Sequence, residues 1–498
     1  MSEHFDVLVV GAGLSGVGAG YWLQTLCPHK TYAILEGRAR KGGTWDLFRY
    51  PGIRSDSDMF TLGYSFRPWT DPKAIADGPS ILRYIEETAR EYGINEKIRY
   101  RQRVVSASWS SEDARWSVEV DTGEAHVVYT CGFLYMCSGY YRYESGYQPE
   151  FAGIGDYGGR IVHPQAWPDD LDYSGKRVVV IGSGATAMTL VPEMAKTAAH
   201  VTMAQRSPTY VVARPSSDAT ADWLRAKLPA KLAYWLARWK NVLFGMYFFN
   251  LCKRQPDKVK AYLLGLVRQQ LPAGYDIAKD FTPRYNPWDQ RLCLITDGDL
   301  FKAISEGRAS VATGAIGKFT EKGVQLTSGE EIEADIVVMA TGLVLQQFGG
   351  ATLTVDGRPV EIANTLNNKG MMYSDVPNLA ATFGYTNASW TLKADLIGQY
   401  VCRILNAMDA KGRRIAVAHN DDPDLPVENF VDFSSGYFQR ALATLPKQGA
   451  RKPWRLYQNY LKDLLSLRYG AIEDGVLRLS NPPAMAAAPV KRPADAAA

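Results

Sequence analysis

Two glycine-rich turns, 171 residues apart, constrain this chain of 498 residues more than any other feature. The first turn, residues 11–16, follows an apolar run at 6–10 and opens a helical pattern over 17–26. A second apolar run, 31–35, then ends at Glu36. A strand, a glycine turn, a helix and a strand, with an acid about 20 residues beyond the last glycine, form the dinucleotide-binding fingerprint. The sequence therefore predicts a nucleotide-binding α/β unit at the N-terminus.

Each conserved position of such a turn has a separate physical role. Gly11 makes the tight turn, Gly13 lets the backbone approach the pyrophosphate, and Gly16 lets the helix pack on the strand. The amides at the start of the helix then hold the anion. We expect Glu36 to accept hydrogen bonds from ribose hydroxyls, which is typical of a site for FAD or an NAD-like nucleotide.

The second turn repeats the pattern with one change. It lies between apolar runs at 177–181 and 200–204, and Gly182 and Gly184 take the first two glycine positions. Ala187 takes the third position, which the fingerprint permits. The sequence therefore predicts a second dinucleotide site.

The residues after the second site favour a different nucleotide. Where the first site has Glu36, the second continues with Arg206 and Ser207. A carboxylate would repel a 2′-phosphate, whereas a guanidinium binds it through two hydrogen bonds. We interpret the second site as an NADPH site. The alternative is that Arg206 is an ordinary solvated charge.

Two further apolar runs show how the units are connected. Residues 133–136 and 335–339 each end in small residues, a pattern that lets a chain pass close to a nucleotide and cross between domains. A simple strand-ending turn is the alternative for each run alone. Length alone predicts about three domains. The predicted fold class is α/β, with two Rossmann-like dinucleotide-binding domains on a glutathione-reductase-like plan and a helical insertion. The predicted boundaries are a discontinuous FAD-binding domain at 1–145 and 343–480, an NADP-binding domain at 146–215 and 284–342, a helical insertion at 216–283, and a disordered tail at 481–498.

The predicted insertion is rich in aromatic and basic residues. Residues 223–251 and 258–271 have helical patterns. The stretch 242–249 is very apolar but too short to span a bilayer. We expect it to be buried in the domain core; a substrate tunnel or a membrane surface contact are the alternatives.

Composition excludes several other classes of protein. The 56 basic and 52 acidic residues leave a net charge of +4, which is small for a nucleic-acid-binding protein. The cysteines show neither CxxC spacing nor a disulfide or zinc-ligand pattern, so no metal site is expected; they are Cys27, Cys131, Cys137, Cys252, Cys293 and Cys402. Without a signal peptide pattern or a transmembrane-length apolar run, we expect a cytoplasmic protein, with peripheral membrane association and oligomeric state left open.

Between the two nucleotide motifs lies a segment that resembles a known family. Residues 157–168 read Tyr-Gly-Gly-Arg-Ile-Val-His-Pro-Gln-Ala-Trp-Pro. This is similar to the Phe-x-Gly-x-x-x-His-x-x-x-Trp motif of the type I Baeyer–Villiger monooxygenases, which are class B flavoprotein monooxygenases. Gly159, His163 and Trp167 match, while Tyr157 replaces phenylalanine and keeps an aromatic ring. Related enzymes that oxidise nitrogen or sulfur usually have Tyr or Phe at the last position, so tryptophan followed by proline favours the Baeyer–Villiger branch.

Segments near the first fingerprint extend the resemblance. Residues Gly43, Thr44 and Trp45, and the stretch 49–56, are similar to the loop on the flavin side of the family's active site. The resemblance implies that Asp56, at the end of this stretch, faces the flavin.

A third segment is similar to the one that supplies the family's active-site arginine, here Arg291. The family usually has lysine before it, which aids recognition of the 2′-phosphate, but this chain has Gln290. NADPH preference therefore rests more on Arg206. The blocks 285–291 and 383–390 further resemble the ethionamide-activating subgroup, and the resemblance covers about residues 5–470.

The resemblance implies a reaction and a set of roles. NADPH would reduce FAD, the reduced flavin would capture O2 as a C4a-peroxide, and attack on a ketone would yield an ester or lactone, with sulfoxidation of thioethers as a side activity. Arg291 would stabilise the peroxide anion, oriented by Asp56. NADP would stay bound and shield the site from water. We expect His163 to couple domain movement to cofactor binding, with plain packing or direct proton transfer as alternatives.

Other functions remain as alternatives. An N- or S-oxygenating flavin monooxygenase would use the same cofactors, and a non-enzymatic redox sensor would bind flavin and NADPH without transferring oxygen. A disulfide reductase needs a paired redox cysteine near the flavin, and the spacing of Cys131 and Cys137 argues against it.

Overall fold

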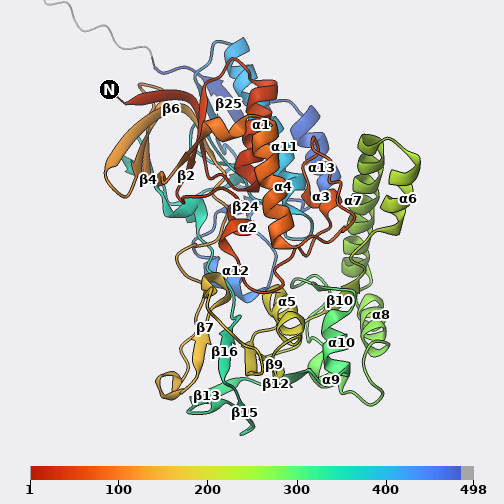
Figure 1. Cartoon of the computed structure of the whole chain (residues 1–498). Helices are drawn as coiled ribbons and strands as arrows, with labels where there is room; N and C mark the ends of the chain where they lie inside the picture. The colour runs from red at the N-terminus through yellow and green to blue at the C-terminus, as the bar shows by residue number, and fades with distance from the viewer. Residues whose placement is uncertain (1, 484–498) are drawn as a thin grey trace, which may run out of the picture.

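The first glycine turn belongs to a nine-stranded sheet that forms the centre of the upper lobe of the molecule (Figure 1). The computed structural model describes residues 2–483. As the sequence predicts, β1 (Glu3–Val10), α1 (Leu14–Leu26) and β2 (Tyr32–Glu36) form a strand–helix–strand unit. β1 lies between β2 and β6 (His126–Met136) and is parallel to both. The sheet order is β18-β17-β4-β5-β6-β1-β2-β3, with β21 beside β6; the other strands are β3 (Ile98–Tyr100), β4 (Arg103–Ser110), β5 (Arg115–Asp121), β17 (Thr352–Val355), β18 (Arg358–Pro359) and β21 (Leu379–Ala381).

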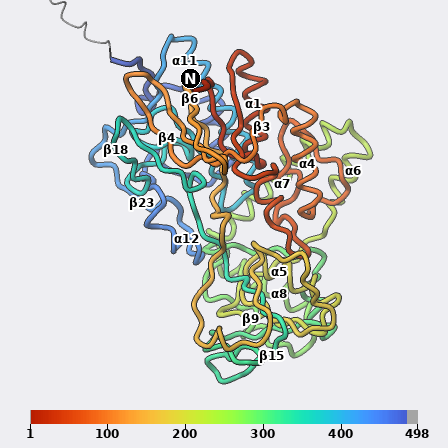
Figure 2. Tube along the Cα trace, turned by 60° about the vertical axis from the view of Figure 1, so that its left-hand side comes forward, coloured from red at the N-terminus to blue at the C-terminus, as the bar shows by residue number. Residues whose placement is uncertain are grey.

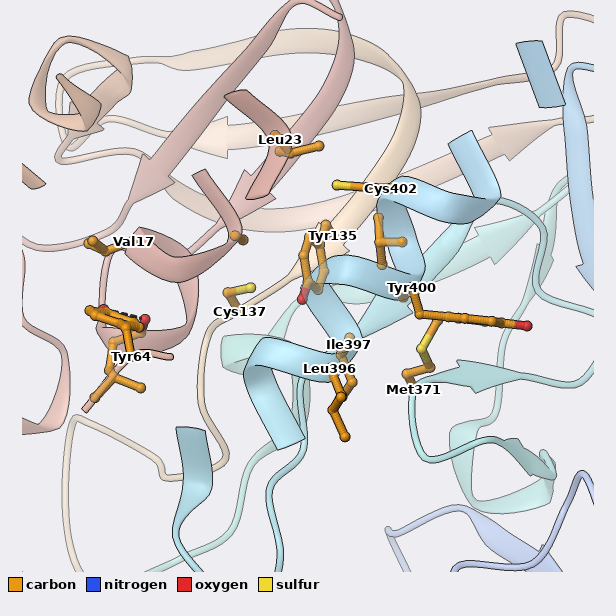
Figure 3. Packing of buried hydrophobic residues seen from close by; sticks show 14 of the residues in the cluster. Val17, Leu23, Tyr64, Tyr135, Cys137, Met371, Leu396, Ile397, Tyr400 and Cys402 are labelled. Carbon is orange, nitrogen blue, oxygen red and sulfur yellow. Dashed lines mark hydrogen bonds between the residues drawn. The ribbon is translucent and has the colours of Figure 1, made fainter. Parts of the chain in front are cut away.

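The main core of this lobe contains residues from the N-terminal and the C-terminal parts of the chain. α1 packs beside α11 (Trp390–Ala410), nearly 400 residues later in the sequence. In Figure 3, Tyr135 of β6 lies beside α11, and Cys137, which directly follows β6, lies between Tyr135 and α1; both belong to the same buried cluster as Leu396 and Ile397 of α11. The remote C-terminal segment is therefore an integral part of the first nucleotide-binding unit.

The second glycine turn belongs to a separate parallel sheet in the lower lobe. Its order is β12-β9-β8-β16-β7, and α5 (Ala185–Met194) follows β8 directly. The strands are β7 (Arg160–Val162), β8 (Arg177–Ile181), β9 (His200–Gln205), β12 (Ala309–Thr313) and β16 (Ile336–Met339). The tube view shows the two lobes one above the other, joined by chain segments that cross between them (Figure 2).

The insertion differs from the single long helix expected over 223–251. The structure has α6 (Ala219–Lys227) and α7 (Ala230–Arg254), separated at Pro229. Proline lacks the backbone N–H and disfavours helical geometry in the residue before it, so the helix breaks there. α8 (Pro256–Arg268) follows and corresponds to the second predicted helix.

The packing of α7 contradicts the expected burial of residues 242–249. Val242 is buried, but Leu243, Phe244 and Tyr247 keep half or more of their surface exposed. One face of α7 packs on the first lobe through Ala233 and neighbouring residues, and successive side chains turn by about 100°, so the others point outward. Within residues 2–483, no helix combines the length and the apolarity needed to cross a membrane.

Smaller elements complete the described chain. The other α-helices are α2 (Thr44–Leu47), α3 (Met59–Leu62), α4 (Gly78–Glu91), α9 (Ile277–Asp280), α10 (Asp299–Ser305), α12 (Gly436–Ala441) and α13 (Tyr460–Leu464). The outer strands include β10 (Val211–Arg214), β11 (Cys293–Thr296), β13 (Ile316–Thr320), β14 (Gly323–Leu326), β15 (Glu331–Glu333), β22 (Ile415–Ala418), β23 (Val427–Asn429), β24 (Lys447–Gly449) and β25 (Leu477–Ser480). The predicted disordered tail lies outside the described residues from position 484 onward.

Candidate active site

A cavity of about 490 Å³ lies at the first glycine turn. Its wall combines segments that are far apart in the sequence, from the first turn to α11. Among the residues predicted for the flavin and catalytic sites, the lining includes Gly11, Gly13, Glu36, Gly43, Thr44, Trp45, Asp56 and Arg291. Gly16 is not part of the wall; a Cβ added there would lie 1.8 Å from the Gly11 carbonyl oxygen, so it holds α1 against β1.

The backbone beside this cavity is closely packed, and at Gly11 it leaves no room for a side chain. Gly11 has φ +102°, and a Cβ there would lie 2.7 Å from the carbonyl oxygen of Cys137. A Cβ on Gly13 would lie 3.4 Å from the Cα of Gly43. Two glycine segments therefore bring bare backbone to the same wall, which is the cradle that a dinucleotide requires.

Glu36 organises the turn from the end of β2. Its carboxylate accepts hydrogen bonds from the backbone N–H groups of Ala12 (2.8 Å) and Arg38 (2.9 Å). Burial raises the pKa of Glu36, and these two hydrogen bonds oppose the rise. The acid is thus fixed at the cavity wall, where the fingerprint places the ribose contact.

The wall of the cavity contains an ion pair between the two lobes. Arg291, in the loop before β11, places its Nη2 2.5 Å from Oδ2 of Asp56, which lies in the segment before α3. The Arg291 side chain is 36% exposed because it faces the cavity. Asp56 raises the pKa of Arg291 above its ordinary value, against the opposing effect of desolvation. The guanidinium is therefore permanently charged.

Three tyrosines surround this arginine, and sequence reasoning missed them all. Tyr140 and Tyr141 follow the strand end at Cys137, and their hydroxyls lie 2.7 Å apart. Tyr437, at the start of α12, also lies beside Arg291. Burial raises the pKa of each of the three phenols, so they are neutral hydrogen-bonding groups at working pH.

Two of these positions could be anticipated from the sequence. Tyr140 and Tyr141 directly follow the small residues 137–139 after β6. Tyr140 also stacks on Trp390, at 5.0 Å between ring centroids. Nothing in local spacing points to Tyr437.

The second glycine turn has a different environment. Gly182 has φ +138°, and a Cβ there would lie 2.2 Å from the carbonyl oxygen of Ala340. Ala187 is fully buried, as a helix-packing position should be. A Cβ on Gly184 would meet nothing within 4 Å, so this backbone faces open space.

Positive charge gathers beside that open backbone. Arg206 and Ser207, directly after β9, are both exposed. Arg440 lies close enough to Arg206 that the like charge adds to the effect of desolvation and lowers the pKa of Arg440. Its guanidinium stacks on the Tyr147 ring at 3.6 Å from the centroid. Sequence reasoning missed Arg440, because it lies more than 200 residues from the second fingerprint.

The residues of the 157–168 motif lie outside the cavity wall. His163 is only 9% exposed, and its Nδ1 accepts a hydrogen bond from the Gln165 N–H (3.2 Å). Burial lowers the pKa of His163 below its ordinary value of 6.5. A Cβ on Gly146 would lie 2.0 Å from the His163 ring, which places the ring against a segment that crosses between the lobes.

The neighbours of His163 have similar packing roles. A Cβ on Gly159 would lie 2.6 Å from the Asp335 carbonyl oxygen, so this glycine lets β7 lie close to the start of β16. Trp167 is half-buried against the core of the second lobe.

Gln290, the residue before Arg291, is also half-buried and lies outside the cavity wall.

Known proteins resemble the chain over nearly its whole length. The family model described as "FMO-like: Flavin-binding monooxygenase-like" matches residues 72–348. The chain is 54% identical, over 97% of its length and 99% of the relative's, to the FAD-containing monooxygenase EthA of Mycobacterium tuberculosis. This match confirms the predicted family.

Solved structures support the fold. An oxidised steroid monooxygenase bound to NADP superposes with a TM-score of 0.75 at 21% identity, covering 96% of this chain and all of the other. Cyclohexanone monooxygenase from Rhodococcus sp. Phi1, bound to NADP+, gives 0.75 at 18% identity, covering 97% and 100%. These similarities confirm the predicted α/β fold class. The chain therefore belongs to the flavin-binding monooxygenase-like family, and it is a flavin monooxygenase.

Proposed function

We propose that this chain is an NADPH- and O2-dependent Baeyer–Villiger monooxygenase that inserts one oxygen atom beside a ketone carbonyl to give an ester or lactone. The proposal assigns FAD to residues 1–145 and 343–480, and NADPH to residues 146–215 and 284–342. The observation that carries it is the Arg291–Asp56 ion pair inside the cavity at the first glycine turn.

The cavity at the first turn suits FAD. Bare backbone at Gly11, Gly13 and Gly43 leaves room for a pyrophosphate. Glu36 would accept hydrogen bonds from the ribose hydroxyls. Thr44 and Trp45 belong to the same wall, directly after Gly43.

The second turn suits NADPH. The open backbone at Gly184 allows a pyrophosphate to approach, at the N-terminus of α5. Arg206 and Ser207 would bind the 2′-phosphate, and the neighbouring Arg440 adds a second positive charge. This second charge would offset the glutamine at position 290.

When bound, FAD reduced by NADPH supplies the activated oxygen. The protein's part is electrostatic. Attack on a carbonyl carbon develops negative charge on oxygen, and a positioned cation stabilises that charge more than water does. Arg291 is such a cation, because it stays protonated at any working pH and Asp56 fixes its orientation.

A second cavity, next to the first, could admit the substrate. It measures about 570 Å³ and is lined by Thr386 and Asn387, together with Phe249 and Trp288. The adjacent Tyr385 and Ala388 line the first cavity, so this one loop borders both spaces. We infer that a ketone, or a thioether in a sulfoxidation side reaction, enters past this loop.

Product analysis tests the proposal directly. Purified protein should be yellow, should consume NADPH and O2 with linear, cyclic or aryl ketones, and should yield an ester by mass spectrometry. NADPH consumption that produces only hydrogen peroxide across the ketone panel would contradict it. Sulfoxide without ester would indicate an N- or S-oxygenating enzyme instead, and flavin reduction without any oxygen transfer would indicate a redox sensor.

The role of Arg291 has its own test. Arg291→Ala should still bind FAD and reduce it with NADPH, but its rate of ester formation should fall by ~10²–10³ because one preorganised cation is lost. Arg291→Lys should retain part of the rate, since it keeps the charge. Wild-type ester yield from the alanine variant would refute the assignment.

A further inference from the structure

The helical insertion presents an apolar stripe to the outside of the molecule. Figure 1 shows α7 and α6 standing at the right-hand edge of the molecule, beside both lobes. Along α7, steps of three or four residues connect Leu232, Trp235, Trp239, Leu243 and Tyr247. Such steps place side chains on one face of a helix. Trp235 is 54% exposed and Tyr247 is 63% exposed, whereas Trp239 is half-buried against Tyr460, so the stripe is exposed on either side of one covered position.

The insertion also exposes large apolar side chains outside the stripe. Phe244 on α7 is 52% exposed, Trp223 on α6 is 61% exposed, and Tyr262 on α8 is 61% exposed. Soluble proteins rarely expose several large apolar side chains in one region unless that region has a binding role. We name the exposed residues of the α7 stripe, Leu232, Trp235, Leu243 and Tyr247, the insertion face.

The opposite side of α7 is fixed, so the insertion face cannot simply turn inward. Ala233 and Ala237 are fully buried in the core of the first lobe. Arg238 donates hydrogen bonds from Nη1 to the carbonyl oxygens of Phe60 (2.8 Å) and Gly63 (2.7 Å). The orientation of α7 is therefore set by the fold.

The charge on α7 has one sign, while the flanking helices α6 and α8 also carry the exposed Asp222 and Asp257. α7 contains lysine and arginine but no aspartate or glutamate. Lys227, Lys231, Arg254 and Lys258, at the ends of the three helices, are all exposed. An exposed helix with aromatic side chains on one face and basic residues at its edges has the chemistry of a helix that lies in the headgroup region of a bilayer.

We propose that the insertion face docks on an anionic lipid bilayer, with α7 parallel to the surface. Tyrosine and tryptophan favour the headgroup level, and lysine and arginine attract anionic headgroups. A symmetric dimer through this face would place the basic residues of both copies against each other, because such an interface pairs the same patch with itself. The charge therefore favours lipid over a second copy of the chain.

Vesicle flotation of the full-length, FAD-loaded protein tests this. The protein should float with phosphatidylcholine–phosphatidylglycerol vesicles and bind pure phosphatidylcholine vesicles at least tenfold more weakly, since each basic residue near the surface adds to the attraction. Two variants separate the contributions: Leu243→Ser/Tyr247→Ser removes apolar contact, and Lys231→Gln/Arg254→Gln removes charge. Each should lower the bound fraction about tenfold or more, with flavin content and melting temperature unchanged.

A control variant changes exposed apolar residues elsewhere. Val128 and Val427 are 48% and 58% exposed and belong to β6 and β23. Val128→Ser/Val427→Ser should float like the wild type. The proposal is overturned if wild-type protein binds neither vesicle, or if Leu243→Ser/Tyr247→Ser binds as well as wild type. It is also overturned if that variant abolishes a dimer seen by light scattering while vesicle binding is absent.

Discussion

In the proposed cofactor site, we expect Arg206 to discriminate between NADPH and NADH. Replacing it with glutamine removes a charge-assisted contact worth about 1.5–3 kcal/mol, so the Kd for NADP+ should rise about 10–100-fold. The Kd for NAD+ should change little, because NAD+ lacks the 2′-phosphate. Titration of the flavin absorbance with each nucleotide measures both constants. If both constants rise equally, Arg206 has no specific role in phosphate recognition.

His163 makes stability depend on pH. Because burial depresses its pKa below 6.5, the unfolded chain binds a proton more readily than the folded chain. The stabilising contribution is therefore complete above pH 6.5 and is lost as the pH falls through the lower folded pKa. Melting temperatures at pH 8.0 and 5.5 should differ more for wild type than for His163→Asn, which keeps an acceptor but does not titrate. An equal shift in both proteins would contradict this.

The individual residues show what a sequence can reveal. Gly11, Gly13 and Gly16 were predictable because the fingerprint fixes their spacing, although the atoms that a Cβ on Gly11 or Gly13 would meet belong to the remote residues Cys137 and Gly43. Arg291 was found only through the family resemblance. Tyr437 and Arg440 were missed, because their proximity to the site depends on how α12 packs against distant segments. The local spacing of residues in the sequence gives no indication of such contacts.

Replacing a glycine with alanine should have different effects on stability and cofactor binding in the two glycine turns. Gly16→Ala would force a Cβ to within 1.8 Å of the Gly11 carbonyl oxygen, so α1 must shift and both melting temperature and FAD content should fall. Gly184→Ala adds a Cβ into open space, so melting temperature and FAD content should stay as in wild type. It should instead raise the KM for NADPH, because the added methyl blocks the pyrophosphate. Differential scanning fluorimetry and steady-state kinetics measure these effects; a stable Gly16→Ala protein with full FAD content would contradict the packing role.

The helical insertion shows the limit of prediction from periodicity. The helices were predictable from composition and spacing, and Pro229 accounts for the break that was missed. Which face of α7 is buried was not predictable, because apolar residues lie on both faces. Tyr234 and Tyr247 are equally apolar in the sequence, yet one is 4% exposed and the other 63%. The difference arises only because α3 and α11 offer a surface to one side of the helix.

One loop of the first lobe makes two ion pairs with the second lobe. Asp56 pairs with Arg291, and Arg54 pairs with Asp299 at the start of α10 (2.6 Å). Both partners belong to the second lobe. A change in the relative position of the lobes would therefore act directly on the ion pair in the cavity wall, and we expect this to link the two proposed cofactor sites.

The insertion is joined to the first lobe by a buried charge, and this connection can be tested. Arg238 Nη2 lies 3.5 Å from Oδ2 of Asp395, and both side chains are almost fully buried. Arg238→Met would leave Asp395 without its partner, which costs about 3–5 kcal/mol for a buried pair. Lys240→Met is a matched control, because its pair with Asp218 is partly exposed and worth ~1 kcal/mol or less.

The loss should also depend on pH. Burial already raises the pKa of Asp395, and losing Arg238 raises it further. A carboxyl whose folded pKa is raised stabilises the fold below its unfolded pKa and loses that effect as pH rises through the folded value. The deficit of Arg238→Met should therefore be larger at pH 8 than at pH 5, and Asp395→Asn in the same chain should remove this pH dependence. Urea unfolding at both pH values measures it; a deficit that is constant with pH would show that lost packing, and not the unpaired acid, destabilises the variant.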